Sequence, residues 1–241
     1  MIVEFIGASG AGKTTLARAV NEGAGRSDVS LAWDLILDRP GLRRITHPTA
    51  RNLLAEGLTL PALAGGWRRH HPFLSFSRQR LGKYSRSRFE RLNYLRSILR
   101  KVGMHEFARR HDRRVVLADE GTVLTAYYLF VYVNSGFDAD ELDRFASLVP
   151  LPDRIVYVRA PLATLVDRSL LRSDRRRELV AVSRGELERW IGRATAVFDH
   201  LVTVPPIRER ATVVDNLDGD PSSLAKLLGG MIFSPSASSG V

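Results

Sequence analysis

Short apolar runs alternate along this chain with longer segments in which apolar residues recur at helical spacing. Five runs of strand length occupy residues 2–6, 29–33, 114–118, 154–159 and 211–215. Mostly apolar runs of this length are typical of strands that are buried on both faces of a sheet. Because helical segments separate them, the pattern predicts an α/β fold in which one parallel sheet is covered by helices on both sides.

The helical segments are predicted from the same spacing. The first begins at Lys13 and ends near Gly23, two more cover residues 123–133 and 138–149, and another follows Ala160-Pro161. A long helical stretch from about residue 177 to 200 precedes the last predicted strand.

Residues 43–113 contain no convincing strand, only helical patches separated by Pro and Gly. The clearest patch covers residues 86–103. We expect an apolar stripe to pack there while Arg86, Arg100 and Lys101 lie away from it; the stripe consists of Phe89, Leu92, Leu95, Ile98, Leu99 and Val102. Residues 43–113 are therefore predicted to form a helical insertion between the second and third strands.

The length of 241 residues and the 44% hydrophobic content suit a single α/β domain with an insertion. We assign residues 1–228 to this domain, including the 43–113 insertion. The last residues, 229–241, have the composition of a flexible C-terminal tail.

Three features predict a cytoplasmic, soluble protein. The chain has no Cys, which suits a reducing compartment. Its first residues already form a strand-like run and leave no room for a signal peptide. The longest apolar run, residues 123–133, is too short for a transmembrane segment, which needs roughly 20 residues.

The net charge of +10 is concentrated in one segment. Residues 67–114 hold 15 Lys and Arg against three acidic residues, a net charge of +12, so the rest of the chain carries −2. Such a segment favours an anionic partner: a phosphorylated metabolite, nucleic acid or an acidic membrane surface. The alternative is a solvated face in a chain that is rich in Arg, since only four of its 36 basic residues are Lys.

The stretch GASGAGKT, residues 7–14, has the spacing G-x-x-x-x-G-K-[ST] and lies between a predicted strand and a predicted helix. Successive backbone N–H groups in such a loop wrap the β-phosphate of a nucleotide at a helix N-terminus. Lys13 is expected to reach the β and γ oxygens, and the Thr14 hydroxyl to bind Mg²⁺. The motif predicts ATP and Mg²⁺ as cofactors; the expected nucleotide-binding residues are Gly7, Ala8, Ser9, Gly10, Ala11, Gly12, Lys13, Thr14 and Thr15. The alternative is an ordinary glycine turn.

Two acidic residues, Asp119 and Glu120, follow the third predicted strand. A carboxylate at this end of the sheet can complete the Mg²⁺ shell or accept the proton of an attacking hydroxyl. We expect Asp119 to bind the metal with Thr14, but the sequence does not separate the catalytic roles of the two acids.

Arginines cluster after the fourth predicted strand, within VDRSLLRSDRRRE. The spacing puts Arg168 and Arg172 on one helical face, and Arg175 follows one turn later or in a mobile loop. Arginines on a closing segment can stabilise the charge of a migrating phosphoryl group, so all three are candidate catalytic residues. The alternative is a solvated helix end.

These motifs together resemble the P-loop nucleotide and small-molecule kinases, the thymidylate kinase-like branch in particular. The resemblance covers residues 1–34 and 114–225. It rests on the GASGAGKT loop, the acidic end of the third strand, PLPDRIVYVRAPLATLVDRSLLRSDRR and the closing ATVVDNLDGD. It implies a P-loop NTPase fold with five parallel strands in the order 2-3-1-4-5, ATP-dependent phosphorylation, and an adenine pocket near residues 216–219 that includes Asn216.

The chain also departs from that branch. Thymidylate kinases carry Asp-Arg-Tyr or Asp-Arg-Phe at the end of the third strand, where this chain has Asp119-Glu120-Gly121. Their Arg-Glu-Pro-Gly after the second strand is only partly matched by residues 38–41, and the basic insertion has no counterpart. Thymidylate is therefore disfavoured as the acceptor.

Three functions fit the sequence to different degrees. The favoured one is a kinase that moves the γ-phosphate of ATP to a small anionic acceptor such as a nucleotide, nucleoside or sugar. An NTP-hydrolysing switch or motor is less favoured, because Asn-Lys-x-Asp and Leu-Ser-Gly-Gly signatures are missing. The third is a P-loop ATPase that binds a nucleic acid end or an acidic membrane through residues 67–114, where aromatic and basic residues alternate. The oligomeric state stays open, a homodimer included.

Overall fold

The computed structural model describes residues 1–25, 29–37, 47–110, 114–133, 136–171, 183–217 and 221–233. Five parallel strands form one sheet in the order β2-β3-β1-β4-β5, as predicted. The strands are β1 (Ile2–Ile6), β2 (Val29–Leu31), β3 (Val115–Ala118), β4 (Arg154–Arg159) and β5 (Ala211–Asp215). The fold is that of a P-loop NTPase, in which neighbouring strands all end at the same edge of the sheet.

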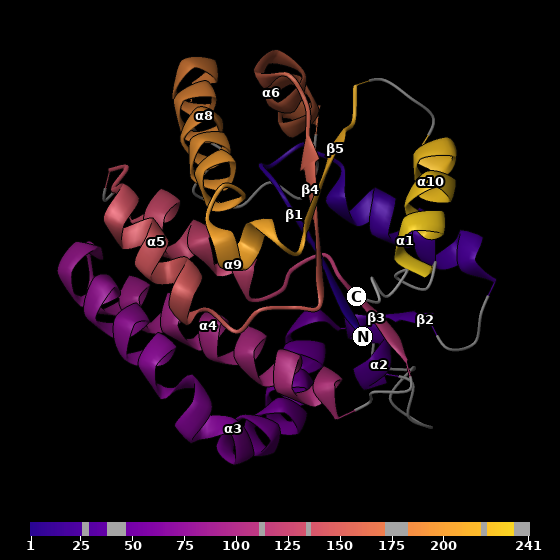
Figure 1. The fold of residues 1–241 in the computed structure, drawn as a ribbon. Helices are drawn as coiled ribbons and strands as arrows, with labels where there is room; N and C mark the ends of the chain where they lie inside the picture. Colours follow the sequence, from indigo (N-terminus) through magenta and orange to yellow (C-terminus); the bar gives the residue numbers. More distant parts are fainter. Residues whose placement is uncertain are drawn as a thin grey trace, which may run out of the picture.

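Helices cover both faces of the sheet (Figure 1). Helix α1 (Lys13–Ala24) packs with α10 (Pro221–Phe233) on one face. The opposite face carries α4 (Arg88–Arg109), α5 (Ala139–Leu148) and α8 (Arg184–Leu201), while α6 (Leu162–Leu171) packs against α8. Two short helices, α2 (Ala32–Leu37) and α9 (Pro205–Arg208), complete the covering.

The C-terminal segment differs from its prediction at one end. Helix α10 continues to Phe233, so residues 229–233, which we assigned to the tail, are helical. The physical reason is burial, because Leu228 and Ile232 lie one turn apart and both pack into the core. Residues 234–241 lie outside the described part of the chain.

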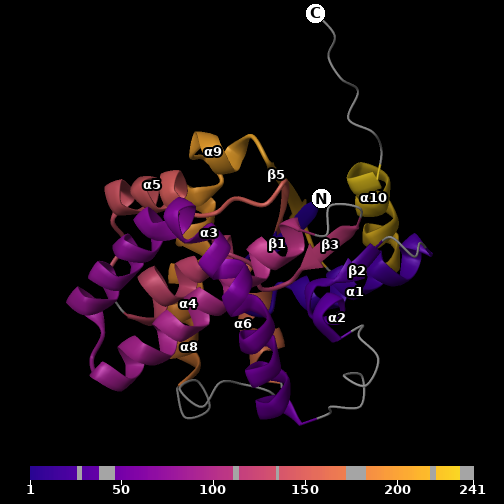
Figure 2. The same cartoon turned by 90° about the horizontal axis from the view of Figure 1, so that it is seen from below.

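The region between β2 and β3 forms two long helices where we predicted separate patches. Helix α3 (Pro48–Tyr84) continues through Pro61 and Pro72, and α4 packs against it. Figure 2 shows that α3 changes direction along its length, as proline within a helix makes it do. A Pro inside a helix costs about 3 kcal/mol; burial of several α3 side chains offsets that cost, among them Leu63, Phe73 and Leu81.

The predicted packing face of α4 is wrong at its N-terminal half. Phe89 is 81% exposed and Leu92 65% exposed, whereas Ile98 and Val102 are fully buried as expected. Lys101, which we expected to lie away from the packed stripe, is only 5% exposed. The reason is the rotation of α4: Tyr94, Ile98, Lys101 and Val102 share the buried face, and Phe89 and Leu92 lie on the opposite side of the helix.

The buried and exposed sides of α4 should differ in how much they contribute to stability. Ile98→Ala should lower the free energy of unfolding by about 2–5 kcal/mol, because it leaves a cavity in the core. Phe89→Ala should change that free energy by less than about 0.5 kcal/mol, because the ring is in water. Urea denaturation of both variants measures the difference. A Phe89→Ala loss as large as that of Ile98→Ala would contradict the observed orientation of α4.

The segment predicted as a helix at 123–133 is helical but not α-helical. It consists of a 3₁₀ turn, η2 (Val123–Thr125), and a π-helical segment, η3 (Tyr127–Tyr132). In a π-helix the residues i and i+5 are one turn apart. Tyr127 and Tyr132 therefore lie side by side, with ring centroids 5.6 Å apart.

Candidate active site

The loop after β1 takes a conformation that only glycine adopts readily. Gly7, Gly10 and Gly12 have φ angles of 137°, 81° and 89°, in the region that L side chains avoid. A Cβ at Gly10 would also collide with the Leu165 carbonyl, and one at Gly12 would lie 2.6 Å from Asn216 Nδ2. The glycines of the motif are thus required both by the turn and by the close approach of α6 and the segment after β5.

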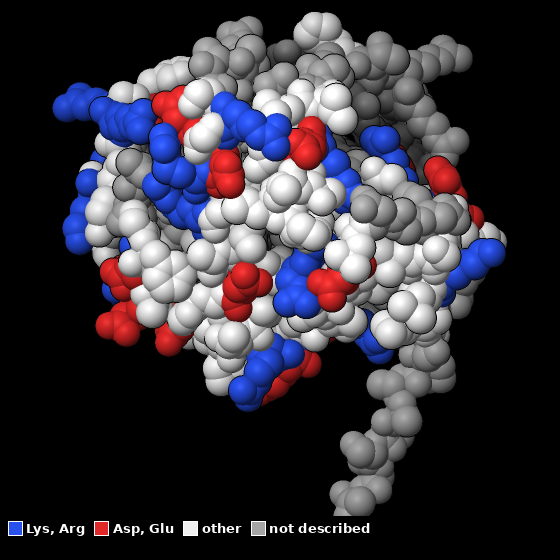
Figure 3. Space-filling view, turned by 90° about the horizontal axis from the view of Figure 1, so that it is seen from above, with Lys and Arg blue, Asp and Glu red and all other residues white. Residues whose placement is uncertain are grey.

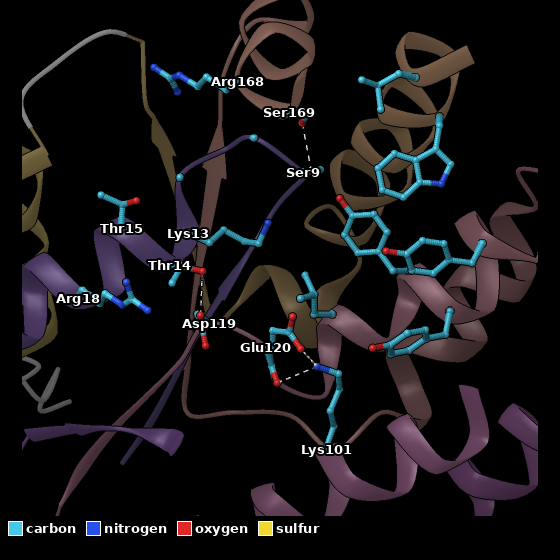
Figure 4. A pocket seen from close by; sticks show the side chains of 18 residues that line it. Ser9, Lys13, Thr14, Thr15, Arg18, Lys101, Asp119, Glu120, Arg168 and Ser169 are labelled. Atoms are coloured by element: carbon cyan, nitrogen blue, oxygen red, sulfur yellow. Dashed lines mark hydrogen bonds and ion pairs between the residues drawn. The ribbon is translucent and has the colours of Figure 1, made fainter. Parts of the chain in front are cut away.

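Lys13 begins α1 and lies across the loop. Its Nζ donates hydrogen bonds to the carbonyls of Gly7 and Ala8, each at 2.9 Å. The Gly7 carbonyl also accepts a bond from the Tyr127 hydroxyl at 3.4 Å. In Figure 4 the Lys13 ammonium points into the cavity beside the loop. Phosphate oxygens would lie there if a nucleotide were bound.

Thr14 and Asp119 are brought together by the order of the strands. Because β1 and β3 are neighbours with Glu4 opposite Ala118, the residue after β3 lies beside the start of α1. The Thr14 hydroxyl donates to Asp119 Oδ2 at 2.8 Å. A hydroxyl and a carboxylate are hard oxygen ligands of the kind that Mg²⁺ takes together with phosphate oxygens. The donor set therefore fits the metal that the sequence motif implies.

Glu120 has a different partner from its neighbour. Lys101 of α4 donates to Glu120 Oε2 at 2.9 Å and to the Glu120 carbonyl at 3.1 Å. Burial acts to lower the pKa of the Lys101 ammonium, but Glu120 and Tyr128 outweigh it and raise that pKa above its ordinary value. The lysine is therefore held charged beneath a carboxylate that is 46% exposed.

The sequence pattern did not identify Lys101 as a residue of the site. The residue belongs to the basic insertion, and the helical spacing placed it away from the packed stripe. One signal was available: it is one of only four lysines among 36 basic residues. A compact ammonium on a long stem, unlike a guanidinium, suits a buried single-point contact of this kind.

A cavity of about 690 Å³ joins these groups (Figure 4). Its phosphate side is lined by the loop, Lys13, Thr14, Thr15, Arg18 and Asp119. The wall beyond Glu120 is largely aromatic and apolar; it consists of Leu124, Tyr127, Tyr128, Tyr132, Leu187 and Trp190. The cavity thus has a phosphate half and an aromatic half, and the two acids lie where they meet.

The aromatic wall was also missed, although YYLFVY is visible in the sequence. The pattern of that run predicted only a helix, one too short to span a membrane. The Trp190 ring of α8 stacks on Tyr127 at 5.6 Å and lies 5.5 Å from Tyr132. The π-helical spacing of the two tyrosines lets both meet the same indole, which a sequence pattern does not reveal.

The arginine cluster is only partly described. Arg168 donates to the carbonyls of Asn216 and Leu217, each at 3.3 Å, and Asn216 Nδ2 donates to the Ala11 carbonyl at 2.9 Å. Figure 4 shows Arg168 directed away from Asp119 and Glu120. These bonds tie α6 and the glycine loop to the segment that follows β5. Arg172 and Arg175 lie outside the described residues.

The basic segment is partly neutralised by ion pairs. Arg69 pairs with Glu106, Arg80 with Glu141, Arg96 with Glu56, and Lys101 with Glu120. Figure 3 looks onto the end of the sheet where the strands finish, and shows Lys and Arg gathered at its upper left with acidic residues among them. Four of the 15 basic residues in this segment thus have an acidic partner within the described part of the fold.

The aromatic residues of this segment mostly pack inward. Phe73, Phe76 and His70 are buried, while Trp67 is about half exposed and contacts His71 at 6.1 Å. This packing weakens the interpretation of the segment as a stacking surface for single strands. Among the helices that the structure describes, none is both long enough and apolar enough to cross a membrane.

Solved structures share this architecture. Thymidylate kinase from Candida albicans matches with a TM-score of 0.55 and 14% identity over 96% of this chain and 90% of that one. Deoxyadenosine kinase from M. mycoides, solved with the products dCMP and dCDP bound, matches at 0.53 and 13% over 98% and 100%. Thymidylate kinase from Ehrlichia chaffeensis matches at 0.50 and 16% over 96% and 97%. No protein-family model matches the chain, and no curated protein matches it by sequence.

These comparisons define the class of the fold. The chain has the fold of the P-loop kinases, and it is compatible with the thymidylate kinase-like branch that the sequence motifs resemble. At 13–16% identity the similarity concerns the fold alone. The particular activity must be argued from the residues of the cavity.

Proposed function

We propose that this protein is a kinase that transfers the γ-phosphate of ATP to a small acceptor held in the aromatic half of the cavity. One observation carries the proposal: adjacent acids at the end of β3 are turned to different partners. Asp119 accepts from Thr14 on the phosphate side, and Glu120 pairs with Lys101 on the acceptor side. A hydrolase needs the metal-binding carboxylate, but a second acid facing an aromatic-lined space suits activation of an organic hydroxyl.

The donor side is assigned to the loop and its neighbours. Backbone amides of residues 10–13 and the Lys13 ammonium would hold the phosphates, while Thr14 and Asp119 would hold Mg²⁺. When bound, Mg–ATP supplies the phosphoryl group and the positive charge that offsets its migration. Asn216 and Arg168 would border the nucleotide at the far side of the loop, and Arg172 and Arg175 are proposed to stabilise the migrating group.

The acceptor side is assigned to Glu120 and the aromatic wall. We assign Glu120 as the general base that takes the proton of the acceptor's attacking group, with Lys101 orienting the carboxylate. Tyr132 and Trp190, which are partly exposed, offer rings against which a sugar or base ring could pack, and the buried Tyr127 supports both of them. Arg18 lies on the phosphate side of the cavity, near the loop, and suits an anionic group that reaches that side. A nucleotide, a nucleoside or a sugar fits this lining.

The proposal is tested by ADP release. Purified protein is incubated with ATP and Mg²⁺, alone and with single members of a panel of nucleosides, nucleotides, sugars and sugar phosphates. We expect at least one acceptor to raise ADP release at least tenfold and to appear as a phosphorylated product by mass spectrometry. ADP release that is the same with and without every acceptor would show a hydrolase and contradict the proposal.

A further inference from the structure

Glu4 is an acidic residue in the middle of an otherwise apolar strand that leads into the phosphate-binding loop. Its side chain is 1% exposed. The carboxylate accepts hydrogen bonds from the Leu124 amide at 2.8 Å and the Val123 amide at 3.1 Å, and the Thr122 hydroxyl lies 3.4 Å from it. All three groups belong to the turn that follows Glu120.

The two amide donors need an acceptor from another part of the fold. The first amides of a helical segment have no carbonyl partner within it, and η2 begins at Val123. Glu4 caps that segment from the neighbouring strand. The fit is close, since a Cβ at Gly121 would collide with the Glu4 carboxyl group. Thr122 is held further by its bond to the Pro150 carbonyl at 2.5 Å.

The turn that Glu4 holds connects the two halves of the cavity. Glu120 precedes it directly, and Leu124 and Tyr127 of the acceptor wall follow it. Glu4 itself lies three residues before Gly7, so one carboxylate ties the strand of the phosphate loop to the segment that carries both the base and the wall. The charged group that faces Glu4 is Lys101 of α4, the partner of Glu120.

Burial of this group is costly. Desolvation raises the pKa of the Glu4 carboxyl to about 7, even though the amides of Leu124 and Val123, Lys101 and Thr122 act to lower it. An apolar side chain would fill the strand without that cost. A carboxylate at this position therefore indicates a need for its hydrogen bonds and not for its volume.

We infer that Glu4 is a positioning residue for phosphoryl transfer, which acts by anchoring the turn at residues 121–124 and thereby holding Glu120 at a fixed place relative to the phosphate-binding loop. The inference rests on the proposed function. A misplaced base slows the chemical step without weakening nucleotide binding.

The test compares Glu4→Gln with a matched control, Glu106→Gln. Glu106 is another buried carboxylate that accepts from His70 at 2.7 Å, but it lies in the insertion and does not line the cavity. We expect Glu4→Gln to lower kcat roughly 10–100-fold with the Kd for ADP within twofold of wild type. Glu106→Gln should leave kcat within twofold. Gly121→Ala should reproduce the kcat loss, because the new Cβ would push the Glu4 carboxyl group away from the turn.

A second readout does not depend on activity. In ¹⁵N-resolved NMR spectra of the wild type, the amide protons of Val123 and Leu124 should exchange slowly with water. Their chemical shifts should change with pH, with a midpoint near pH 7. Both the slow exchange and the pH-dependent shift should be lost in Glu4→Gln. Unchanged amide exchange, or a kcat loss no larger than that of Glu106→Gln, would overturn the inference. If the wild type transfers no phosphate but its amides respond as expected, the proposed function fails and the anchoring by Glu4 stands.

Discussion

Glu120→Gln will slow phosphoryl transfer by about 10²–10⁴-fold while leaving nucleotide binding intact. The amide keeps the size of the carboxylate but cannot take a proton from the acceptor. Because Thr14 and Asp119 are untouched, the concentration of Mg²⁺ that supports half-maximal nucleotide binding should not change. Single-turnover transfer rates and calorimetric Kd values for Mg–ADP measure the two effects separately.

Asp119→Asn serves as the contrasting variant, since it alters the group paired with Thr14. It should raise the Mg²⁺ requirement severalfold as well as slow transfer. Glu22→Gln, on the exposed side of α1, controls for loss of a carboxylate as such. If Glu120→Gln retained more than a tenth of the wild-type rate, Glu120 would not be the base, and the roles of the two acids would have to be reassigned.

Lys13→Met should reduce kcat/KM by roughly 10²–10³-fold, which corresponds to about 3–4 kcal/mol of lost transition-state stabilisation. The ammonium that now bonds the Gly7 and Ala8 carbonyls is the group positioned to meet the phosphate oxygens. Steady-state kinetics with varied ATP measure the loss. Lys83→Met removes an exposed lysine from the end of α3 and should leave kcat/KM within twofold. Equal losses in both variants would mean that charge in general, and not the loop lysine, supports the reaction.

The basic insertion contributes one particular residue to the cavity, beyond the general positive charge that its sequence indicates. Among the cations of the insertion that the structure describes, Lys101 lines the cavity, and it does so paired with Glu120. The buried Lys101 ammonium therefore joins the insertion to the site, while Arg69, Arg80 and Arg96 make ion pairs elsewhere. A positioning pair of this kind is sensitive to geometry, so the effects of Lys101 and Glu120 variants should not be additive.

Local sequence was sufficient for the strands and the phosphate-binding loop. Apolar runs identified all five strands, although the second ends at Leu31 and not at residue 33, because Ala32 begins α2. The glycine spacing identified the loop. Both signals depend on residues that are neighbours along the chain. The strand order came from the resemblance to P-loop kinases, and the sheet confirms it. Once that order is known, Thr14 and Asp119 are expected to meet, since β1 and β3 are adjacent.

Only the tertiary structure decided which side of each later element faces the site. The helical period of α4 is visible in the sequence, but its rotation depends on what packs against it, and so Lys101 is buried while Phe89 is exposed. The contacts of the π-helical tyrosines were also decided by tertiary structure. They pack against Trp190, which belongs to a helix more than 50 residues further along the chain. Asp119 and Glu120 are adjacent in sequence, yet they have different partners because Thr14 and Lys101 approach them from different elements. Periodicity is a local property of the chain, whereas the choice of partners is made by contacts between distant segments.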